Sequence, residues 1–139
     1  MIKSELAKGN PTILVDAGNW GDTKDFAPWD KTQFIFDMMA EMKYDAVTPG
    51  DAELMEGVDA LKALLASQPQ VKAVSANLKD KSGRLVLPES VVIDRGGVRF
   101  GVTGTTGGSY YNFNVTRGLQ SKDDFTFEDS KAALQRVLP

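Results

Sequence analysis

The feature that most constrains the fold is an alternation of short apolar runs and amphipathic helical patterns in the first half of the chain. Apolar runs lie at Thr12–Asp16, Asp45–Pro49 and Val71–Asn77, and helical patterns at Lys31–Tyr44 and Val58–Ser67 separate them. A short apolar run bounded by turn residues is typical of a buried strand in a parallel sheet. Strands and helices that alternate in this way predict parallel βαβ units with right-handed crossovers. The sequence therefore predicts an α/β fold.

Both helical patterns carry apolar residues at helical spacing. In Lys31–Tyr44 these residues recur three or four positions apart, and we expect them to form the side that packs on the core. Asp30 precedes this pattern and is placed to cap the helix. The apolar side of the second helix is formed by leucines. The expected core residues of the two helices are Phe34, Ile35, Met38, Met39, Met42, Leu61, Leu64 and Leu65.

The pattern changes in the second half of the chain, where a hairpin is predicted. Val91–Arg95 and Val98–Thr103 are β-type runs separated only by Gly96 and Gly97, which is the sequence form of a two-residue hairpin. The remaining segments are a short amphipathic stretch at Ile2–Gly9, loops at Gly104–Tyr111 and Asp123–Phe127, and a final helix over Glu128–Leu138 with Ala132, Leu134, Val137 and Leu138 on its apolar side.

Composition excludes several kinds of site. The 139 residues are 42% hydrophobic, which is enough for one domain with a core, and we expect residues 1–139 to form a single domain. The chain has no His and no Cys, so it offers no imidazole base, thiolate nucleophile or disulfide. Its net charge is −3 without a basic cluster, which argues against nucleic acid as a partner. No apolar run reaches the length of a membrane span, so no membrane partner is expected.

Oxygen-bearing side chains follow two of the predicted strands. Oxygen ligands at neighbouring strand ends suit a hard or borderline divalent cation. Without His they predict only a weak site of the calcium or magnesium type, and the alternative is that they are solvated loop residues or helix caps. These residues are Asp16, Asn19, Asp22, Asp51 and Glu53.

A glycine-rich loop follows the second strand of the predicted hairpin. Gly104–Ser109 carries three glycines and three hydroxyl side chains, a composition that can cradle phosphate. The loop lacks the Lys of a P-loop, however, and no strong helical pattern follows it. The alternative is that it simply connects the hairpin to the next element.

Four segments match, in order and spacing, the motifs of one known family. They are Ile-Leu-Val-Asp-Ala-Gly-Asn at Ile13–Asn19, Tyr-Asp-Ala-Val-Thr-Pro-Gly-Asp-Ala-Glu-Leu-Met-Glu-Gly at Tyr44–Gly57, Val-Ser-Ala-Asn-Leu at Val74–Leu78, and Gly-Val-Arg-Phe-Gly-Val-Thr-Gly at Gly97–Gly104. The corresponding family motifs are L-x-x-D-A-G-D, Y-D-A-x-x-x-G-N-H-E-F-D-x-G, S-A-N and G-V-K-x-G-x-x-G. The chain therefore resembles the metallophosphatase domain of the 5′-nucleotidase family, within the calcineurin-like phosphoesterases.

The resemblance implies a fold and a reaction. The fold is a four-layer α/β–β/α sandwich with two metals at the strand ends, of which this chain would form a part. The reaction is metal-dependent hydrolysis of a phosphate ester, in which a metal-bound water attacks the phosphorus. The resemblance also implies a small phosphate ester or nucleotide as the ligand and a periplasmic or exported location.

The chain departs from the family at the positions that hold the metals. The family's metal-bridging Asp corresponds to Asn19, its Asn ligand to Asp51 and its catalytic His to Ala52. An amide carries no charge and bridges two cations poorly, and alanine cannot donate a proton. We therefore assign no catalytic and no cofactor-binding residue, and expect at most one divalent cation (Mn, Zn, Mg or Ca) at Asn19 and Asp51. Asp16 is expected to support its loop.

Two functions stay open at this point. The first is a phosphoesterase that is active only in a longer protein, because the family's opening D-x-H motif and later G-H and G-H-x-H motifs have no counterpart here and the chain is expected to be an incomplete part of a larger domain. The second is a non-catalytic binding or scaffold domain that keeps the fold. In either case an incomplete sheet has unpaired edges, which favours homodimers through exposed sheet edges or the terminal helices.

Overall fold

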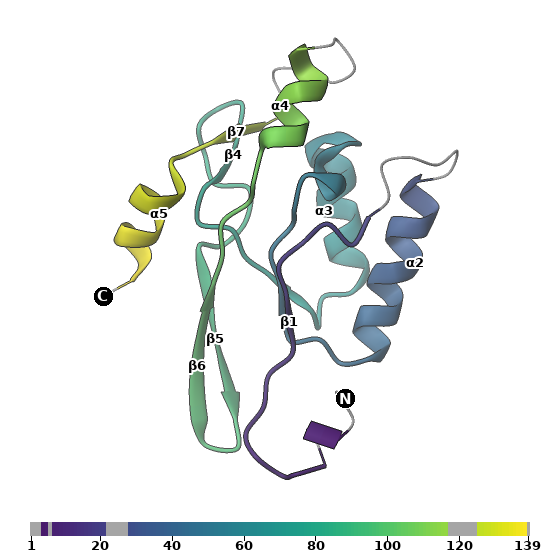
Figure 1. Ribbon diagram of the computed structural model, residues 1–139, viewed down its shortest axis with the longest axis vertical. Coiled ribbons are helices and arrows are strands. Elements are labelled where there is room, and N and C mark those ends of the chain that lie inside the picture. Colours follow the sequence, from purple (N-terminus) through teal and green to yellow (C-terminus); the bar gives the residue numbers. More distant parts are fainter. Residues whose placement is uncertain (1–3, 6, 22–27, 117–124, 139) are drawn as a thin grey trace.

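A parallel sheet and two helices form the first half of the computed structural model, which describes residues 4–5, 7–21, 28–116 and 125–138 (Figure 1). Strands β1 (Val15–Asp16), β2 (Ala46–Val47) and β3 (Lys72–Ala73) pair in parallel in the order β1-β2-β3. Helices α2 (Pro28–Glu41) and α3 (Gly57–Ser67) connect them and lie on the same side of β1, away from the hairpin. The predicted α/β fold with parallel βαβ units is confirmed.

The predicted hairpin is confirmed, and its two turn residues are the predicted Gly96 and Gly97. Strands β5 (Ser90–Arg95) and β6 (Val98–Thr103) pair antiparallel along their whole length. Gly96 and Gly97 have φ values of 60° and 79°. A turn with positive φ at both central residues matches the twist of the flanking strands, and glycine adopts that conformation without strain.

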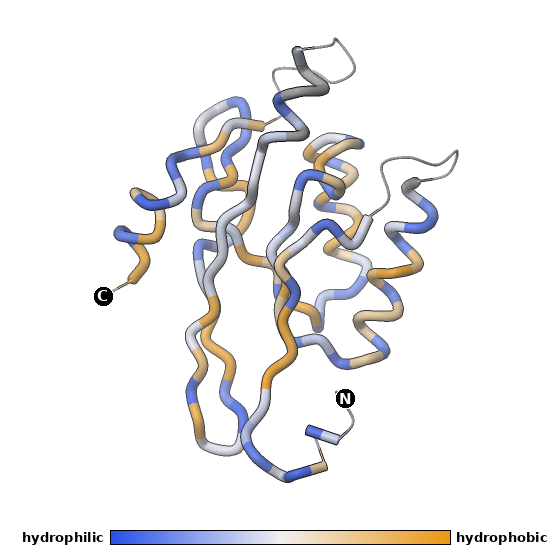
Figure 2. Tube along the Cα trace, in the orientation of Figure 1, coloured by the Kyte–Doolittle hydropathy of each residue, from blue (hydrophilic) through white to orange (hydrophobic). Residues whose placement is uncertain are grey.

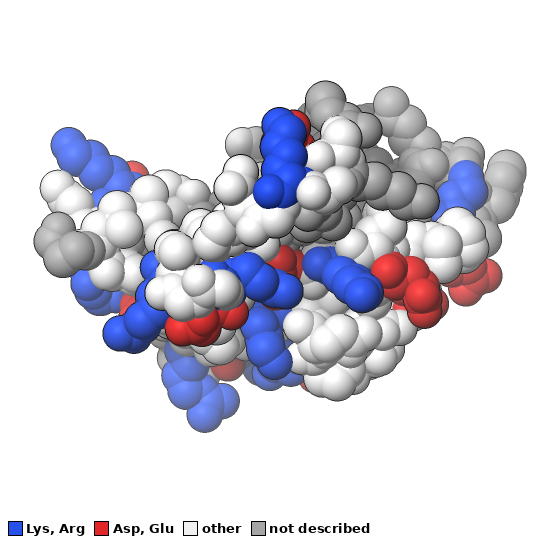
Figure 3. Space-filling view, turned by 90° about the horizontal axis from the view of Figure 1, so that it is seen from below, with Lys and Arg blue, Asp and Glu red and all other residues white. Residues whose placement is uncertain are grey.

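An ion pair connects the turn end of the hairpin to the parallel sheet. Arg95 forms an ion pair with Asp45, the residue before β2, and the same carboxylate accepts a hydrogen bond from the Leu14 backbone N–H at 2.9 Å. On the surface at this end of the molecule, Figure 3 shows Lys and Arg side chains interspersed with Asp, Glu and uncharged residues. The hairpin thus lies beside β1 and β2 without joining their sheet.

Two segments that were expected to be loops contain regular structure. Helix α4 (Ser109–Thr116) follows the glycine-rich loop, and β7 (Phe125–Phe127) pairs antiparallel with β4 (Leu78–Asp80). The expectation of loops over Gly104–Tyr111 and Asp123–Phe127 is therefore wrong in part, because β7 is formed by pairing with a strand far away in the sequence. Residues 123–124 of the second segment lie outside the described residues.

The last helix forms as predicted, and its predicted apolar side is confirmed in part. Helix α5 (Ser130–Val137) is capped by Asp129, whose carboxylate accepts a hydrogen bond from the Ala132 N–H at 2.9 Å. Ala133 is its buried residue. Of the predicted apolar side, Leu134 and Val137 are half-buried, whereas Ala132 and Leu138 are exposed. The predicted opening stretch Ile2–Gly9 is described only in part, with Ser4 and Glu5 helical.

Helix α2 is rotated relative to the prediction. Its buried residues are Thr32, Phe36 and Met39, while Phe34 and Met38 in the helix and Met42 directly after it are 63%, 39% and 49% exposed. The predicted core side is thus confirmed for Met39 and, as a partly buried residue, Ile35, but it is wrong for the three exposed residues. The helix also begins at Pro28, so Asp30 lies within its first turn and does not cap it. Two sides of this helix are apolar, and spacing alone cannot choose between them.

The core is built mainly from α2, α3, β2, β4, α4 and β7. Apolar residues also occur along β1 and the hairpin (Figure 2), but Val15, Val92 and Val98 there are exposed. The three predicted leucines of α3 are buried, which confirms that helix's orientation. Tyr111 of α4 joins the core and packs edge-on against Phe125 and Phe127 of β7, with ring centroids 5.5 and 5.8 Å apart. No helix among the described residues is long and apolar enough to cross a membrane.

Candidate functional site

The buried carboxylate of Glu53 holds together the loops that follow β1 and β2. Its Oε2 accepts hydrogen bonds from the N–H groups of Asn19 at 2.9 Å and Gly50 at 2.7 Å, and its Oε1 accepts one from Gly21 at 2.7 Å. Glu53 has no exposed surface. Charge-assisted hydrogen bonds of this kind are about twice as strong as neutral ones. Glu53 was among the candidate metal ligands, but its position makes it an anchor of the two loops.

The same two loops approach so closely that glycine is required on each. Gly18 has a φ of 93°, and a Cβ there would lie 2.3 Å from the Gly50 backbone nitrogen. A Cβ at Gly50 would lie 2.5 Å from Asn19 Oδ1. Contacts this short exclude any side chain unless the backbone moves. The loop after β1 is thus seated directly on the loop after β2.

Asn19 contacts the chain on both sides of Asp51. Its Oδ1 accepts a hydrogen bond from the Ala52 N–H at 3.1 Å and also lies against Gly50. Its own φ is 61°, in the left-handed region that Asn tolerates better than most residues. The structure therefore brings together the two positions that the resemblance assigned to metal.

Asp51 connects the loop after β2 to helix α4. Its Oδ1 accepts a hydrogen bond from the Tyr111 N–H, in the first turn of α4, at 3.3 Å. A carboxylate at this place complements the positive end of the helix dipole. This role could not be found from the sequence, because it joins residues that no local pattern relates.

Asp16 supports its own loop, as expected. Its Oδ1 accepts a hydrogen bond from the Gly18 N–H at 2.8 Å, which is an Asx turn at the end of β1. Asp22, the last of the five candidate ligands, lies outside the described residues.

These contacts provide a test of the two-metal centre that the resemblance implies. Within the described ranges, no three acidic, His or Cys side chains come together in a way that could hold a metal ion. The Asn19 amide oxygen and one Asp51 oxygen already accept backbone N–H groups, and both oxygens of Glu53 do so. The donor set of the described residues therefore does not fit a two-metal centre.

The glycine-rich loop is used for packing. Its Thr106 is buried and donates its N–H to Asn77 Oδ1 at 2.8 Å. A Cβ at Gly108 would lie 2.5 Å from the Phe127 ring, and one at Gly104 would lie 2.1 Å from Thr48 Oγ1. A phosphate cradle needs backbone N–H groups directed at the ligand, and the Thr106 group is directed at Asn77. These contacts favour the structural alternative for this loop.

Asn77 is the centre of a buried polar cluster that was not predicted from the sequence. Its Nδ2 donates to the carbonyl oxygens of Thr106 at 3.0 Å and Glu128 at 3.2 Å. Ser75 Oγ lies 3.2 Å from Asn77 Oδ1 and 2.8 Å from Thr106 Oγ1. The cluster joins the end of β3 to the loop after β6 and to the start of α5, which indicates a structural role for the Ser-Ala-Asn segment.

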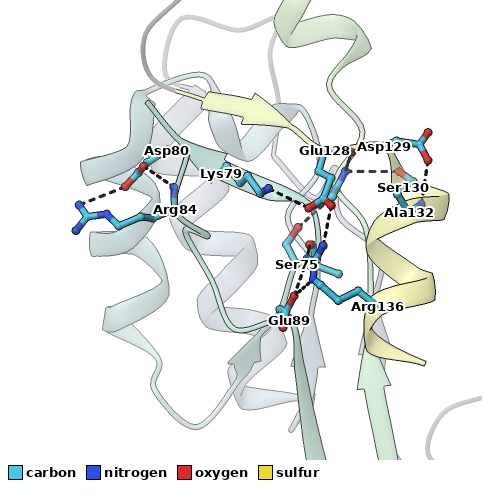
Figure 4. A network of polar contacts seen from close by, with 12 residues as sticks. Ser75, Lys79, Asp80, Arg84, Glu89, Glu128, Asp129, Ser130, Ala132 and Arg136 are labelled. Carbon is cyan, nitrogen blue, oxygen red and sulfur yellow. Dashed lines mark hydrogen bonds and ion pairs between the residues drawn. The ribbon is translucent and has the colours of Figure 1, made fainter. Parts of the chain in front are cut away.

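A network of charges beside this cluster fixes α5 in place (Figure 4). Arg136 donates to Glu89 at 2.6 Å, to Glu128 at 2.7 Å and to the Ala76 carbonyl oxygen at 2.8 Å, and Lys79 lies 3.1 Å from Glu128. The hydrogen bond from Arg136, followed by that from Lys79, lowers the pKa of the Glu128 carboxyl below its usual value. The pKa of Arg136 is raised, chiefly by Glu128 and then by Glu89.

A cavity of about 230 Å³ lies between β1, β2 and β6, next to the loops that Glu53 joins. Its polar lining includes Asp16, Thr48, Thr103 and Thr105, and none of the described Lys or Arg residues contributes to it. An acidic side chain without a basic partner does not suit a phosphate group. The cavity thus gives no support to anion binding at this end of the sheet.

Solved structures share this fold, although no protein-family model and no curated protein sequence matches the chain. A 5′-nucleotidase precursor from Thermus thermophilus aligns with 97% of the chain at a TM-score of 0.70 and 20% identity. The calcineurin-like phosphoesterase YfkN from Bacillus subtilis aligns with 99% at a TM-score of 0.77 and 21% identity. The NAD nucleotidase of Haemophilus influenzae aligns with 96% at 0.70 and 19% identity.

The comparison confirms the resemblance at the level of the fold. The chain has the α/β fold of part of a metallophosphatase domain of the 5′-nucleotidase and calcineurin-like kind. It spans 26%, 47% and 24% of these three structures, a quarter to a half of their lengths.

Proposed function

We propose that this chain forms an incomplete part of a metallophosphatase-like domain, that it does not hydrolyse phosphate esters by itself, and that it binds at most one divalent cation, at Asn19 and Asp51. The observation that carries this proposal is the buried Glu53 carboxylate, which accepts three backbone N–H groups from the two loops. These bonds join the two loops through the chain's own groups.

The chemistry of phosphate ester hydrolysis supports the first part of the proposal. The reaction uses cations that lower the pKa of a water molecule and neutralise the phosphoryl oxygens, and it benefits from an acid near the leaving group. Asn19 provides no charge to bridge two cations, and Ala52 stands where the family has its catalytic His. The chain contains no His elsewhere to take over that role.

A single cation is the most that the two positions support. Asn19 Oδ1 contacts Gly50 and Ala52, the neighbours of Asp51. One amide and one carboxylate oxygen are hard ligands, which suit Mg²⁺, Ca²⁺ or Mn²⁺ better than Zn²⁺. Asn19 Oδ1 and Asp51 Oδ1 each accept one backbone N–H, which uses part of their capacity as ligands, and two side-chain ligands alone hold a cation weakly.

The second candidate function is phosphate ester hydrolysis by a longer protein. It is favoured by the names of the similar structures, two of which are nucleotidases, and by the small share of those structures that this chain spans. In that protein, further segments would supply the missing ligands, and a small phosphate ester or nucleotide would be the substrate. One of the similar structures is a precursor, and we accordingly propose an exported or periplasmic location.

Hydrolysis of p-nitrophenyl phosphate and of AMP by the purified chain tests the proposal that the chain is inactive by itself. We expect no turnover above background with Mn²⁺, Co²⁺ or Zn²⁺. Turnover that a chelator abolishes, and that is also lost in the Asn19→Ala and Asp51→Ala variants, would contradict the proposal. A residual rate that both variants retain would indicate a contaminating phosphatase. That result would agree with an inactive chain.

A further inference from the structure

A second cavity, which the candidate site does not use, lies between the end of α3, the outer edge of β3 and the start of β5. Its volume is about 390 Å³. Cavities that hold small molecules in proteins measure about 300–1,000 Å³ and are lined chiefly by apolar side chains with a few polar groups. This cavity therefore has the size of a site for a small apolar molecule. The apolar side chains of its walls include Leu65, Val71, Val74, Leu87 and Val91.

One positive charge lies at the rim of this cavity. Lys72 is exposed and contributes to the lining, whereas none of the described acidic residues does. Its Nζ donates a hydrogen bond to the carbonyl oxygen of Pro69, another lining residue, at 2.9 Å. This bond uses one of the three N–H groups of the ammonium and holds the ammonium beside the cavity. The other two N–H groups remain for a ligand.

The acidic side chains next to the lining residues are engaged by other groups. Among the described residues, Lys72 forms no ion pair with any of them. Its charge is therefore available to an anion that enters the cavity. The contacts of these acidic side chains are those of Glu89 with Arg136, of Asp45 with Arg95, and of Asp37 with the amides of Gln33 and Gln68.

A backbone donor lies beside Lys72. The N–H groups of Lys72 and Val74 donate to β2, to the carbonyl oxygens of Asp45 and Val47, both at 3.0 Å. Because N–H groups alternate in direction along a strand, the Ala73 N–H points away from β2. β3 is the last strand in the order β1-β2-β3, so this N–H lies on the free edge of the sheet, and Ala73 lines the cavity.

We propose that this cavity binds a small apolar carboxylate, such as a medium-chain fatty acid, with the hydrocarbon body among the apolar walls and the carboxylate at Lys72 and the Ala73 N–H. The two oxygens of a carboxylate can accept from both donors at once. One positive charge suits this singly charged group better than a phosphate monoester, which carries nearly two charges and three acceptor oxygens. The cavity is separate from the loops after β1 and β2, so the inference is independent of the proposed function.

Titration of the whole isotope-labelled chain with octanoate, followed by NMR chemical shifts of the backbone amides, tests the proposal. Octanamide is the matched neutral probe. We expect the largest shifts at the cavity residues, above all at Ala73, with millimolar affinity because the ion pair is exposed. Octanamide should bind about threefold more weakly. No shifts at the cavity residues, or equal affinities of the two probes, would overturn the proposal.

Substitutions separate the charge from the shape of the cavity. Lys72→Gln should remove the preference for octanoate over octanamide, and the control Lys131→Gln, at an exposed site on α5, should keep it. Ala66→Phe places a ring at the cavity wall and should abolish binding of both probes, whereas Ala132→Phe, at another exposed helical site, should not.

Thermal melting checks that each variant folds, and Lys72→Gln decides the matter if Ala66→Phe does not fold. A Lys72→Gln chain that keeps the preference, or a folded Ala66→Phe chain whose cavity residues still respond to octanoate, would overturn the proposal. An extended apolar peptide that shifts the same amides where octanoate does not would also overturn it.

Discussion

The backbone N–H of Tyr111 donates a hydrogen bond to Asp51 Oδ1 at 3.3 Å, across 60 residues of sequence. The contact places the Asp51 carboxylate beside the first turn of α4 and joins that helix to the loop after β2. The position of Asp51 corresponds to a metal ligand in the family that the chain resembles. Here its carboxylate binds the protein's own backbone, as do those of Glu53 and Asp16.

Replacing Asp51 tests its role at α4. Asp51→Asn keeps an acceptor oxygen but removes the charge, and it should lower the free energy of unfolding by about 0.5–1 kcal/mol. Asp51→Ala also removes the acceptor and should cost about 1–2 kcal/mol. Urea denaturation measures both. Equal stabilities of the two variants and the natural chain would show that the contact does not stabilise α4.

Replacing Glu53 tests the anchor of the two loops. Glu53→Gln removes the buried charge and presents an amide N–H₂ to backbone donors, so we expect a loss of about 2–4 kcal/mol in the free energy of unfolding. The matched control is Glu56→Gln at an exposed site nearby, which should change it by less than about 0.5 kcal/mol. The same small effect at both positions would exclude an anchoring role for Glu53.

The close approach of the loops can be separated from the effect of positive φ. Gly18 and Gly83 both have positive φ, at 93° and 77°, but a Cβ at Gly83 meets nothing within 4 Å. Gly83→Ala should therefore cost about 1–2 kcal/mol from backbone conformation alone. Gly18→Ala should cost at least about 2 kcal/mol more, because the new methyl group meets Gly50 and Thr48. Similar losses in thermal or urea unfolding would mean that the loops can separate freely.

The Glu128 network predicts a dependence of stability on pH. Arg136 and Lys79 lower the pKa of Glu128 in the folded chain below its usual value of 4.5. The stabilisation is therefore present above that value and is lost as the pH falls through the lower folded-state pKa. The stability difference between the natural chain and Glu128→Gln should shrink as the pH falls from neutral to acidic. A difference that stays constant with pH, measured by urea unfolding, would contradict this assignment.

Local signals explain what could be predicted from the sequence. The hairpin was predicted because Gly96 and Gly97 determine its turn without help from distant residues. The parallel sheet followed from the alternation of strands and helices. Strand β7 and helix α4 were missed because partners far away in the sequence, β4 and Asp51, stabilise them.

The candidate site was predictable only in part. The order of the motifs predicted that Asn19 lies close to Asp51, and in the structure Asn19 contacts Ala52, the residue after Asp51. The role of Glu53 was not visible, because a buried carboxylate that binds backbone N–H groups has the same sequence form as a metal ligand. The prediction of which side of α2 is buried was wrong for another reason. Both sides of the helix are apolar, and packing against the rest of the core selects the one that is buried. The expectation that nucleic acid is not a partner stays a prediction.

The central claim is that the strand-end loops are held by the chain's own hydrogen bonds and not by a two-metal centre. Calorimetric titration of the whole chain with Mn²⁺ tests it most directly, with Asn19→Ala as the matched variant. The account predicts at most one weakly bound cation per chain, which the variant no longer binds. Two cations per chain, bound at micromolar or tighter affinity, would contradict it.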